Sequence, residues 1–400
     1  MLANNFYGSE APSGETIVLE VERALLEKRG HQISQFFRHS DEIRNSGFRG
    51  MLTGAMATPW NPFSVRAIRA ALDKVLPDIV HVHNTFPLIS PSIFSAIGSQ
   101  SARVLTLHNY RLFCPAAIPM RNNRVCTECM TKRSVVPSLR HGCYRNSKAA
   151  TVPLAANVAL HRSLGTWVKH VDAFITLSDF QRDLMVAAGL PAELTHVKPN
   201  FYPGEPDTLP WANREPAVIY AGRLSAEKGV DDLLHAWIRW GASAPELRIL
   251  GDGEIRSQLE SIARQNPDIP IRFLGQLSGE EAHNHIATAQ LLVLPSRCYE
   301  GFPMVIREAF AFGTPVAVSD LGPLPTIVSH GENGVVFRAG DPQSLLREVQ
   351  ALWDSPDTRS ALAVGARNTY ESKYTEEVNY QQLMDIYEQA KEVSRSRKRA

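Results

Sequence analysis

The sequence contains no uninterrupted apolar run close to the roughly 18 residues that a membrane-spanning helix needs. The first residues lack the basic and apolar regions of a signal peptide. Neither sign of charge is in excess, because 42 basic residues stand against 41 acidic ones. This balance does not mark a nucleic-acid binder or a disordered chain. We therefore expect a cytoplasmic protein that binds no nucleic acid.

Cysteine is scarce, and the odd number of five argues against a secreted disulfide scaffold. Four of the cysteines form the spacing Cys114-x11-Cys126-x2-Cys129-x13-Cys143. Four thiolates with a C-x2-C core predict a structural zinc that pins a long loop. Reduced, unbound cysteines and a disulfide or redox role are the alternatives. Cys298 lies outside this group, and we assign it no chemistry.

The chain does have enough apolar residues for two cores, with 44% apolar content over 400 residues. Helical patterns fill many of the gaps between short β-branched runs, and one places Val230, Leu233, Leu234 and Trp237 on a single face. This alternation predicts parallel sheets with helices on both faces, and ligands at the carboxyl ends of the strands. The expected strands cover residues 78–82, 104–107, 173–177, 217–221, 247–250, 271–274, 291–294 and 316–318.

A proline-rich segment divides the chain. We expect an N-terminal domain over residues 1–198, a linker over 199–216 and a C-terminal domain over 217–377. Residues 391–400 are basic and lack apolar anchors, which predicts a frayed, solvated tail. A helix over about 378–400 that packs back on the first domain is the alternative.

The clearest chemical signal is the segment 295–309. A buried strand ends at Pro295, a glycine-containing loop follows, and a helix starts near Phe302 to Met304. The free N–H groups of such a helix start, including that of Val305, attract phosphate. Glu308 lies one turn into this helix, where a carboxylate can accept two ribose hydroxyls. Glu300, on the loop, is placed to hydrogen-bond a sugar.

A second element, residues 220–229, follows an earlier strand and carries two cations. A diphosphate leaving group gains negative charge as its bond to the sugar breaks. Arg223 and Lys228, next to Gly222, would stabilise that charge in the transition state. The alternative is that both are surface cations beside a turn.

With Gly222-Arg223, Lys228-Gly229, residues 250–253 and two glutamates eight positions apart, the sequence resembles the family 4 retaining glycosyltransferases of the GT-B fold. The resemblance implies two Rossmann-like α/β domains that face each other across a cleft, and a metal-independent enzyme that needs no catalytic cofactor and retains anomeric configuration. It implies that Arg223 and Lys228 grip the diphosphate, that Glu308 binds ribose, and that Glu300 contacts the transferred sugar. Pro303 and Thr326 depart from the family, which commonly has glycine and glutamate there.

In the N-terminal half, the loop 7–14 precedes a helix, with Ser13 as its N-cap. The resemblance places Ser13 and Gly14 against the donor phosphates, where the family has a glycine pair. Only Met1 to Asn5 are left to form a strand before the loop, so we expect either an upstream start or a shortened first strand. His108 follows a strand at its carboxyl end, and the family has an active-site histidine there that contacts the donor sugar. We interpret His81 and His83 as packing or loop residues.

Residues 121–148 carry seven cations and one carboxylate. Such a loop would bind an anionic acceptor, such as a lipid-linked diphosphate, at the inner membrane surface; a solvated face is the alternative. We expect transfer of a hexose from a nucleotide sugar, UDP rather than GDP, to a polysaccharide or glycolipid intermediate. The rival functions are a GT-B epimerase or phosphorylase, and a catalytically silent nucleotide-sugar-binding protein.

Overall fold

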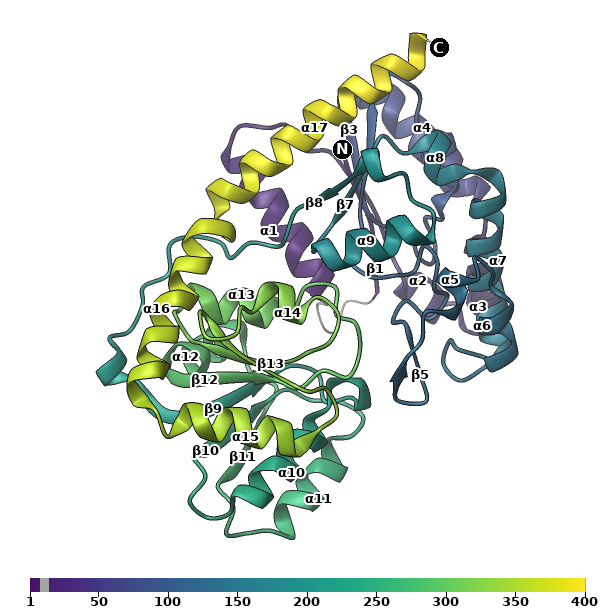
Figure 1. Ribbon diagram of the computed structural model, residues 1–400. Coiled ribbons are helices and arrows are strands. Elements are labelled where there is room, and N and C mark those ends of the chain that lie inside the picture. The colour runs from purple at the N-terminus through teal and green to yellow at the C-terminus, as the bar shows by residue number, and fades with distance from the viewer. Residues whose placement is uncertain (8–13, 400) are drawn as a thin grey trace. The chain divides into compact units, whose positions relative to one another are not determined.

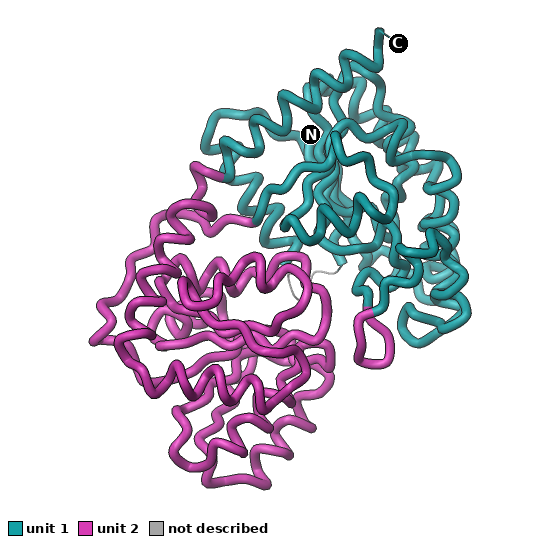
Figure 2. Tube along the Cα trace, viewed as in Figure 1, with its two compact units in different colours: residues 1–119, 126–199, 379–400 teal, residues 120–125, 200–378 magenta. Residues whose placement is uncertain are grey.

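The computed structural model describes residues 1–7 and 14–399, and divides the chain into two compact units (Figure 2). The first unit comprises residues 1–119, 126–199 and 379–400, and the second comprises residues 120–125 and 200–378. Ser13, the expected N-cap, lies outside the described residues. None of the described helices is both long enough and apolar enough to cross a membrane.

The first unit contains a six-stranded, fully parallel sheet (Figure 1). In spatial order its strands are β2 (Gln35–His39), β1 (Leu2–Phe6), β3 (Ile79–Asn84), β4 (Ala102–Thr106), β7 (Ala173–Thr176) and β8 (Thr195–Val197). β1 is short, as expected, yet it is completely buried between β2 and β3. The strand order reverses between β1 and β3, which is the kind of point where ligands bind in doubly wound sheets.

Helices flank this sheet, and several begin at caps that the sequence provides. Asn61 accepts hydrogen bonds from the N–H groups of Phe63 and Ser64 at the start of α4, and Pro62 occupies the first helical position. The helices are α1 (Gly14–Lys28), α2 (Asp41–Arg44), α3 (Gly47–Ala57), α4 (Pro62–Val75), η1 (Pro91–Ser95), α5 (Glu128–Thr131), α6 (Val136–His141), α7 (Lys148–Leu164), α8 (Thr166–His170), α9 (Asp179–Ala188) and η2 (Ala192–Leu194).

The C-terminal segment corrects one expectation. Residues 391–399 are not a frayed tail but the end of α17 (Glu376–Arg399). Leu383, Ile386 and Ala390 recur at helical spacing and pack against buried residues of β4 and β7. Near the helix end, Arg397 pairs with the buried Asp172 at 3.2 Å. These contacts hold the helix on the first unit.

The second unit contains another six-stranded parallel sheet. Its strands are β11 (Ile271–Gly275), β10 (Glu246–Leu250), β9 (Glu215–Ala221), β12 (Ala289–Leu294), β13 (Val316–Ser319) and β14 (Gly334–Phe337). The strand order reverses between β9 and β12. Glu215 and Pro216, which we expected in the linker, are already part of β9.

Helices cover both faces of the second sheet, with α13 and α14 on one side and α10, α11 and α15 on the other (Figure 1). They are η3 (Trp211–Asn213), η4 (Ala226–Lys228), α10 (Val230–Trp240), α11 (Arg256–Arg264), α12 (Gly279–Thr288), α13 (Met304–Ala311), α14 (Leu324–Ile327), α15 (Pro342–Trp353) and α16 (Pro356–Lys373). The predicted apolar face of α10, including Val230 and Trp237, is fully buried. A short antiparallel hairpin, β5 (Met120–Arg121) with β6 (Arg124–Val125), completes the strands.

Candidate functional site

The loops after β9 and β12 meet at the point where the strand order of the second sheet reverses. The backbone N–H of Arg297, in the β12 loop, donates to the carbonyl of Glu227, in the β9 loop, at 2.8 Å. Gly229 has a φ of +68°, and a Cβ at this position would lie 2.1 Å from the carbonyl oxygen of Pro295. Only glycine allows this approach. The two loops are therefore locked side by side, with Lys228 and Glu300 in reach of each other.

Lys228 and Glu300 form the centre of this site. The ammonium of Lys228 lies 2.8 Å from Oε1 and 3.0 Å from Oε2 of Glu300. The hydroxyl of Ser296 donates to the same carboxylate at 2.6 Å. Burial alone would lower the pKa of Lys228, but the attraction of Glu300 outweighs burial and raises that pKa above its ordinary value. Lys228 is therefore fixed as a cation.

Arg223 lies on the same loop as Lys228 but is more exposed, with 61% of its side chain accessible. Its guanidinium is held by Glu227 at 2.5 Å. Gly222, the preceding residue, donates its N–H to the carbonyl of Leu250 and so joins this loop to the end of β10. Two cations thus stand on one loop at the carboxyl edge of the second sheet, a suitable place to bind a diphosphate.

Helix α13 begins at Met304, inside the expected range. The N–H of Ile306 donates to the carbonyl of Pro303 at 3.1 Å, and the N–H groups of Met304 and Val305 precede this first bond of the helix. Val305 is half-buried in this turn. Phe302 is buried, and its ring packs edge-on against Tyr374 with centroids 5.4 Å apart. Phe302 can therefore serve a ligand only through its backbone.

Glu308 lies in the second turn of α13, and 18% of its side chain is accessible. It approaches His283 Nε2 at 3.9 Å and the guanidinium of Arg307 at 3.8 Å. The structure thus brings Lys228 and Glu300 into contact, whereas Glu308 stands one helical turn beyond the loop with a different set of neighbours. This separation suits a carboxylate that binds a different part of the same nucleotide.

The first unit places His108 in the lining of a cavity beside His83, Asn109 and Arg111. His108 Nε2 lies 3.0 Å from His83 Nδ1, and the rings stack with centroids 5.2 Å apart. Burial, and the charge that His83 would carry, hold the pKa of His108 well below its usual range, so this ring is neutral at pH 7. Gly14, by contrast, is exposed as the first residue of α1.

The interpretation of His81 and His83 as packing or loop residues was incomplete. Both lie on β3 in contact with the buried carboxylate of Glu22, at 3.1 Å and 3.3 Å. Glu22 also accepts a hydrogen bond from the ammonium of Lys198 at 2.9 Å. Sequence reasoning missed both charged residues. The available signal was that Glu22 falls on the buried face of α1, between Leu19 and Leu25.

The four cysteines of the expected zinc site lie on one loop-rich segment of the first unit. Cys114 and Cys129 are buried, and no cysteine in the described chain forms a disulfide. Burial raises the pKa of the Cys114 thiol to about 12. A tetrahedral zinc with Zn–S bonds of about 2.3 Å would hold its sulfur ligands about 3.8 Å apart. Among the described residues, no three of these sulfurs lie within 4.8 Å of one another. The zinc site stays a prediction that requires the sulfurs to close around the metal.

Comparisons with known proteins agree with this architecture. The model of the family described as Glycosyltransferase Family 4 matches residues 14–203, and the model described as Glycosyl transferases group 1 matches residues 215–355. Glycogen synthase of Mycobacterium tuberculosis is 32% identical over 217 residues, which are 52% of this chain and 51% of that protein. Alpha-D-kanosaminyltransferase of Streptomyces kanamyceticus is 30% identical over 237 residues, 55% of this chain and 61% of that protein. The chain spans about half the length of the curated relatives it matches.

Solved structures show the same fold. Sucrose-phosphate synthase from Thermosynechococcus elongatus superposes with a TM-score of 0.68 at 18% identity, covering 97% of this chain and 98% of that one. Anabaena HepE, in complex with UDP and glucose, superposes with a TM-score of 0.62 at 18% identity, covering 96% and 98%. The fold, two parallel-sheet α/β domains, is that of the GT-B glycosyltransferases. Within this class, the chain belongs to the family 4 glycosyltransferases.

Proposed function

We propose that this protein transfers a hexose from a nucleotide sugar, with UDP as the favoured nucleotide, to a polysaccharide or glycolipid intermediate. The observation that carries the proposal is the contact between Lys228 and Glu300 at the carboxyl edge of the second sheet. In the absence of a donor, each of these groups neutralises the other. When a donor binds, Lys228 would turn to the diphosphate and Glu300 to hydroxyls of the sugar.

The reaction we propose retains the configuration of the anomeric carbon and needs no metal. The bond from the anomeric carbon to the diphosphate oxygen breaks, and the acceptor hydroxyl oxygen bonds to the same face. The proton of the acceptor passes to the departing phosphate oxygen. The charge that builds up on the diphosphate would be stabilised by Arg223, Lys228 and the N–H groups at the start of α13. Glu308 would accept the ribose hydroxyls, and His108 would contact the donor sugar.

A thermal-shift screen over UDP, GDP, ADP and TDP sugars tests the proposed donor. We expect UDP-hexoses to raise the melting temperature most, and to release UDP slowly by hydrolysis when no acceptor is present. Stabilisation without any release of nucleoside diphosphate would favour a silent nucleotide-sugar-binding protein. If no sugar nucleotide shifts the melting temperature at millimolar concentration, the proposal fails.

We further propose that the acceptor is presented at an anionic membrane surface. Helix α3 supports this, because it turns its apolar face outward: Phe48, Met51 and Leu52 are 77%, 62% and 54% exposed. Its opposite face contains Gly50 and Gly54, which pack on Ile43: a Cβ on Gly50 would lie 2.1 Å from the carbonyl oxygen of Ile43, and a Cβ on Gly54 would lie 2.6 Å from its Cδ1. An exposed helix face of this kind is typical of helices that lie in a lipid interface.

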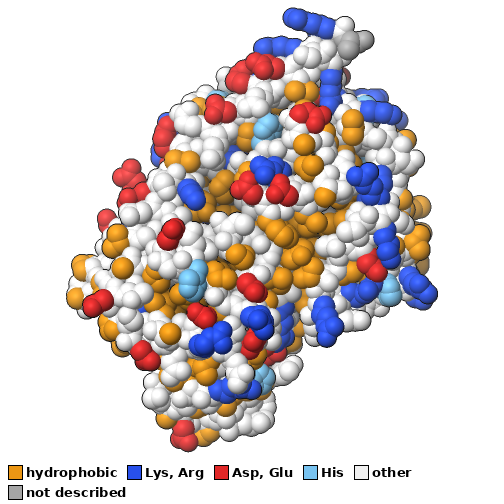
Figure 3. Space-filling model, in the orientation of Figure 1, with side chains coloured by type: hydrophobic (Ala, Val, Ile, Leu, Met, Phe, Trp, Pro, Cys, Tyr) orange, Lys and Arg blue, Asp and Glu red, His pale blue; other side chains and the backbone are white. Residues whose placement is uncertain are grey.

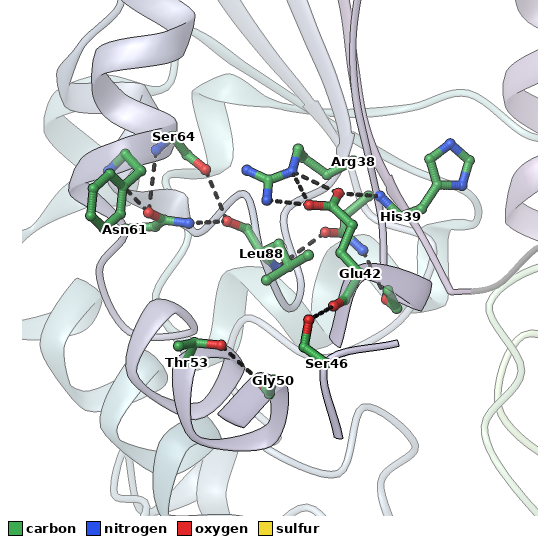
Figure 4. Close-up of polar contacts among 12 residues, drawn as sticks. Arg38, His39, Glu42, Ser46, Gly50, Thr53, Asn61, Ser64 and Leu88 are labelled. Carbon is green, nitrogen blue, oxygen red and sulfur yellow. Dashed lines mark hydrogen bonds and ion pairs between the residues drawn. The ribbon is translucent and has the colours of Figure 1, made fainter. Parts of the chain in front are cut away.

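The surroundings of α3 support the same partner. Eight of the fifteen exposed large apolar side chains in the described chain lie between Phe48 and Leu76. Close to this segment, Arg38 pairs with Glu42 and Asn61 caps α4, so these polar groups have partners within the first unit (Figure 4). Lys and Arg side chains also line the edge of the first unit where α5 and α6 lie (Figure 3). Apolar anchors on a unit that also presents cations suit anionic lipids.

Vesicle sedimentation tests this surface. We expect the protein to sediment with vesicles that contain phosphatidylglycerol and to remain free of pure phosphatidylcholine vesicles. Phe48→Ser/Leu52→Ser should abolish the binding, whereas Val364→Ser, at a 61% exposed apolar position of the second unit, should not. Equal binding of the double variant and the unaltered protein would contradict the assignment.

The expected structural zinc is tested by metal analysis of protein purified without added zinc. The four cysteines would hold the ion as thiolates and fix the loop of the first unit. We expect one equivalent, and less than about a tenth of an equivalent would exclude a tight site.

A further inference from the structure

A buried ion pair lies beneath the His108 cavity and is not used by the proposed chemistry. Glu22, on α1, and Lys198, after β8, have side chains that are 1% and 4% exposed. Their charged groups are 2.9 Å apart, and the ammonium also donates to Asn379 at 3.1 Å. Burying two charges is costly unless their remaining hydrogen-bonding capacity is used. The second carboxylate oxygen, Oε1, therefore needs donors of its own.

Two histidines on one face of β3 approach that oxygen. His81 Nδ1 lies 3.1 Å and His83 Nε2 lies 3.3 Å from Glu22 Oε1. Both ring nitrogens of His81 have hydroxyl partners as well, Tyr387 at 2.8 Å and Thr106 at 2.7 Å. Glu22, His81 and His83 are close enough to share a metal ion. However, the Lys198 ammonium already supplies the positive charge at Glu22, so we do not interpret this group as a metal site.

The protonation states of these groups determine which atom donates and which accepts in each hydrogen bond. Burial opposes the charge of Glu22, but Lys198, His81 and the hydrogen bonds hold its pKa well below the usual range, so it is a carboxylate that can only accept. Glu22 Oε1 and His83 Nε2 are both buried, and within the described chain neither has a well-aligned partner. A lone pair on His83 Nε2 would face the carboxylate at 3.3 Å, so this nitrogen is the one that carries the proton.

The position of the proton on His83 determines the position of the proton on His108, which lines the cavity. An imidazole that carries a single proton, on Nε2, has a lone pair on Nδ1, which can only accept. His108 Nε2, 3.0 Å away, must therefore carry a proton and donate it to His83. Because His108 is neutral, its Nδ1 is left as an acceptor.

We propose that Glu22 and His83 are positioning residues that fix the tautomer of His108, so that the ring offers a hydrogen-bond acceptor to a hydroxyl group of a sugar in this cavity. The juxtaposition that carries the inference is the chain of contacts from Lys198 through Glu22 and His83 to His108. The inference rests on the proposed function for the identity of the ligand. The tautomer itself is independent of that function.

Nitrogen-15 NMR of histidine-labelled protein tests the inference without donor or turnover. The His108 signals are assigned from a spectrum of His108→Gln. We expect the unaltered protein to show a protonated Nε2 and an unprotonated Nδ1 at His108. A proton on Nδ1, or rapid averaging between tautomers, would overturn the proposal even if the enzyme transfers sugar as proposed.

Two charge-neutral double variants separate positioning from packing. Glu22→Met/Lys198→Met removes the acceptor, and Glu22→Gln/Lys198→Met keeps an acceptor oxygen at the same place without leaving a buried charge unpaired. We expect the Met/Met variant to mix the His108 tautomers and to lower kcat by about tenfold, the worth of one hydrogen bond, with nucleotide affinity unchanged. The Gln/Met variant should restore the single tautomer. A single tautomer in a folded Met/Met variant would refute the role of Glu22.

If the Met/Met variant does not fold, His83→Leu provides the same test, because it breaks the chain but leaves the Glu22 and Lys198 pair in place. We expect mixed His108 tautomers in this variant too, and a single tautomer would contradict the role of His83. A failure of the nucleotide-sugar screen would overturn the proposed function alone, since the tautomer measurement needs no ligand.

Discussion

Replacing Lys228 by methionine should affect both stability and turnover, in amounts that follow from its contact with Glu300. The ammonium lies 2.8 Å from the carboxylate, and the two side chains are 21% and 11% exposed. At an effective dielectric constant of about 20, the attraction at this distance is about 6 kcal/mol, most of which desolvation offsets. Breaking a fully buried pair costs about 3–5 kcal/mol. For this partly exposed pair we expect a loss of about 1–3 kcal/mol in the free energy of unfolding.

The effect on catalysis can be separated from the effect on stability. If Lys228 stabilises the departing diphosphate, Lys228→Met should lower turnover at least about a hundredfold. Adding Glu300→Gln removes the unpaired carboxylate, so the double variant should regain most of the stability and none of the turnover. Urea unfolding measures the stability, and release of nucleoside diphosphate from the donor measures the turnover. A Lys228→Met enzyme that is less stable but turns over within about threefold of the unaltered protein would refute the catalytic role.

Three further outcomes are expected. Arg223→Ala should lower turnover at least about a hundredfold with almost no change in melting temperature. The melting temperature should hold because the side chain is 61% exposed and surface ion pairs contribute about 0–1 kcal/mol. A loss of turnover together with a matching loss of stability would count against a direct role of Arg223 in catalysis. Glu308→Ala should weaken nucleotide diphosphate binding in calorimetry by about tenfold to a hundredfold, and unchanged affinity would exclude the ribose contact. Burial lowers the pKa of His81 from 6.5 to about 4, so folding should lose about 3 kcal/mol as pH falls from 6.5 to 4. His81→Gln should flatten that part of a stability profile.

Local sequence patterns predicted the middle of both sheets. All eight expected strands exist. Seven lie inside their sheets, where a parallel sheet buries an apolar run on both faces, and β11 stands at an edge. β2, β8 and β14 were missed. Each stands at an edge of its sheet, where a strand of three to five residues has little apolar pattern to detect. The C-terminal helix was predicted only as the alternative to a frayed tail, although Leu383, Ile386 and Ala390 stand at helical spacing.

The loops proposed to bind the donor could be predicted from sequence because their requirements are local. Position 229 must be glycine for the two loops to come into contact. A lysine and a glutamate close to that contact, Lys228 and Glu300, indicate a site for a charged ligand. The pair formed by Glu22 and Lys198 could not be recognised in this way. Its members are 176 positions apart, and no local rule brings a helix and the end of an edge strand to the same point.

The sequence by itself determined the strand and helix segments, the turn glycines and the types of charged group available, since these depend on neighbours within a few residues. Only the tertiary structure decided which strands are adjacent, that α17 returns to the first sheet, and that a carboxylate, an ammonium and two histidines share one buried point. Such contacts form because the burial of apolar faces brings together segments that are distant in the sequence. A charge that is buried in this way is stable only where the fold also places a partner beside it.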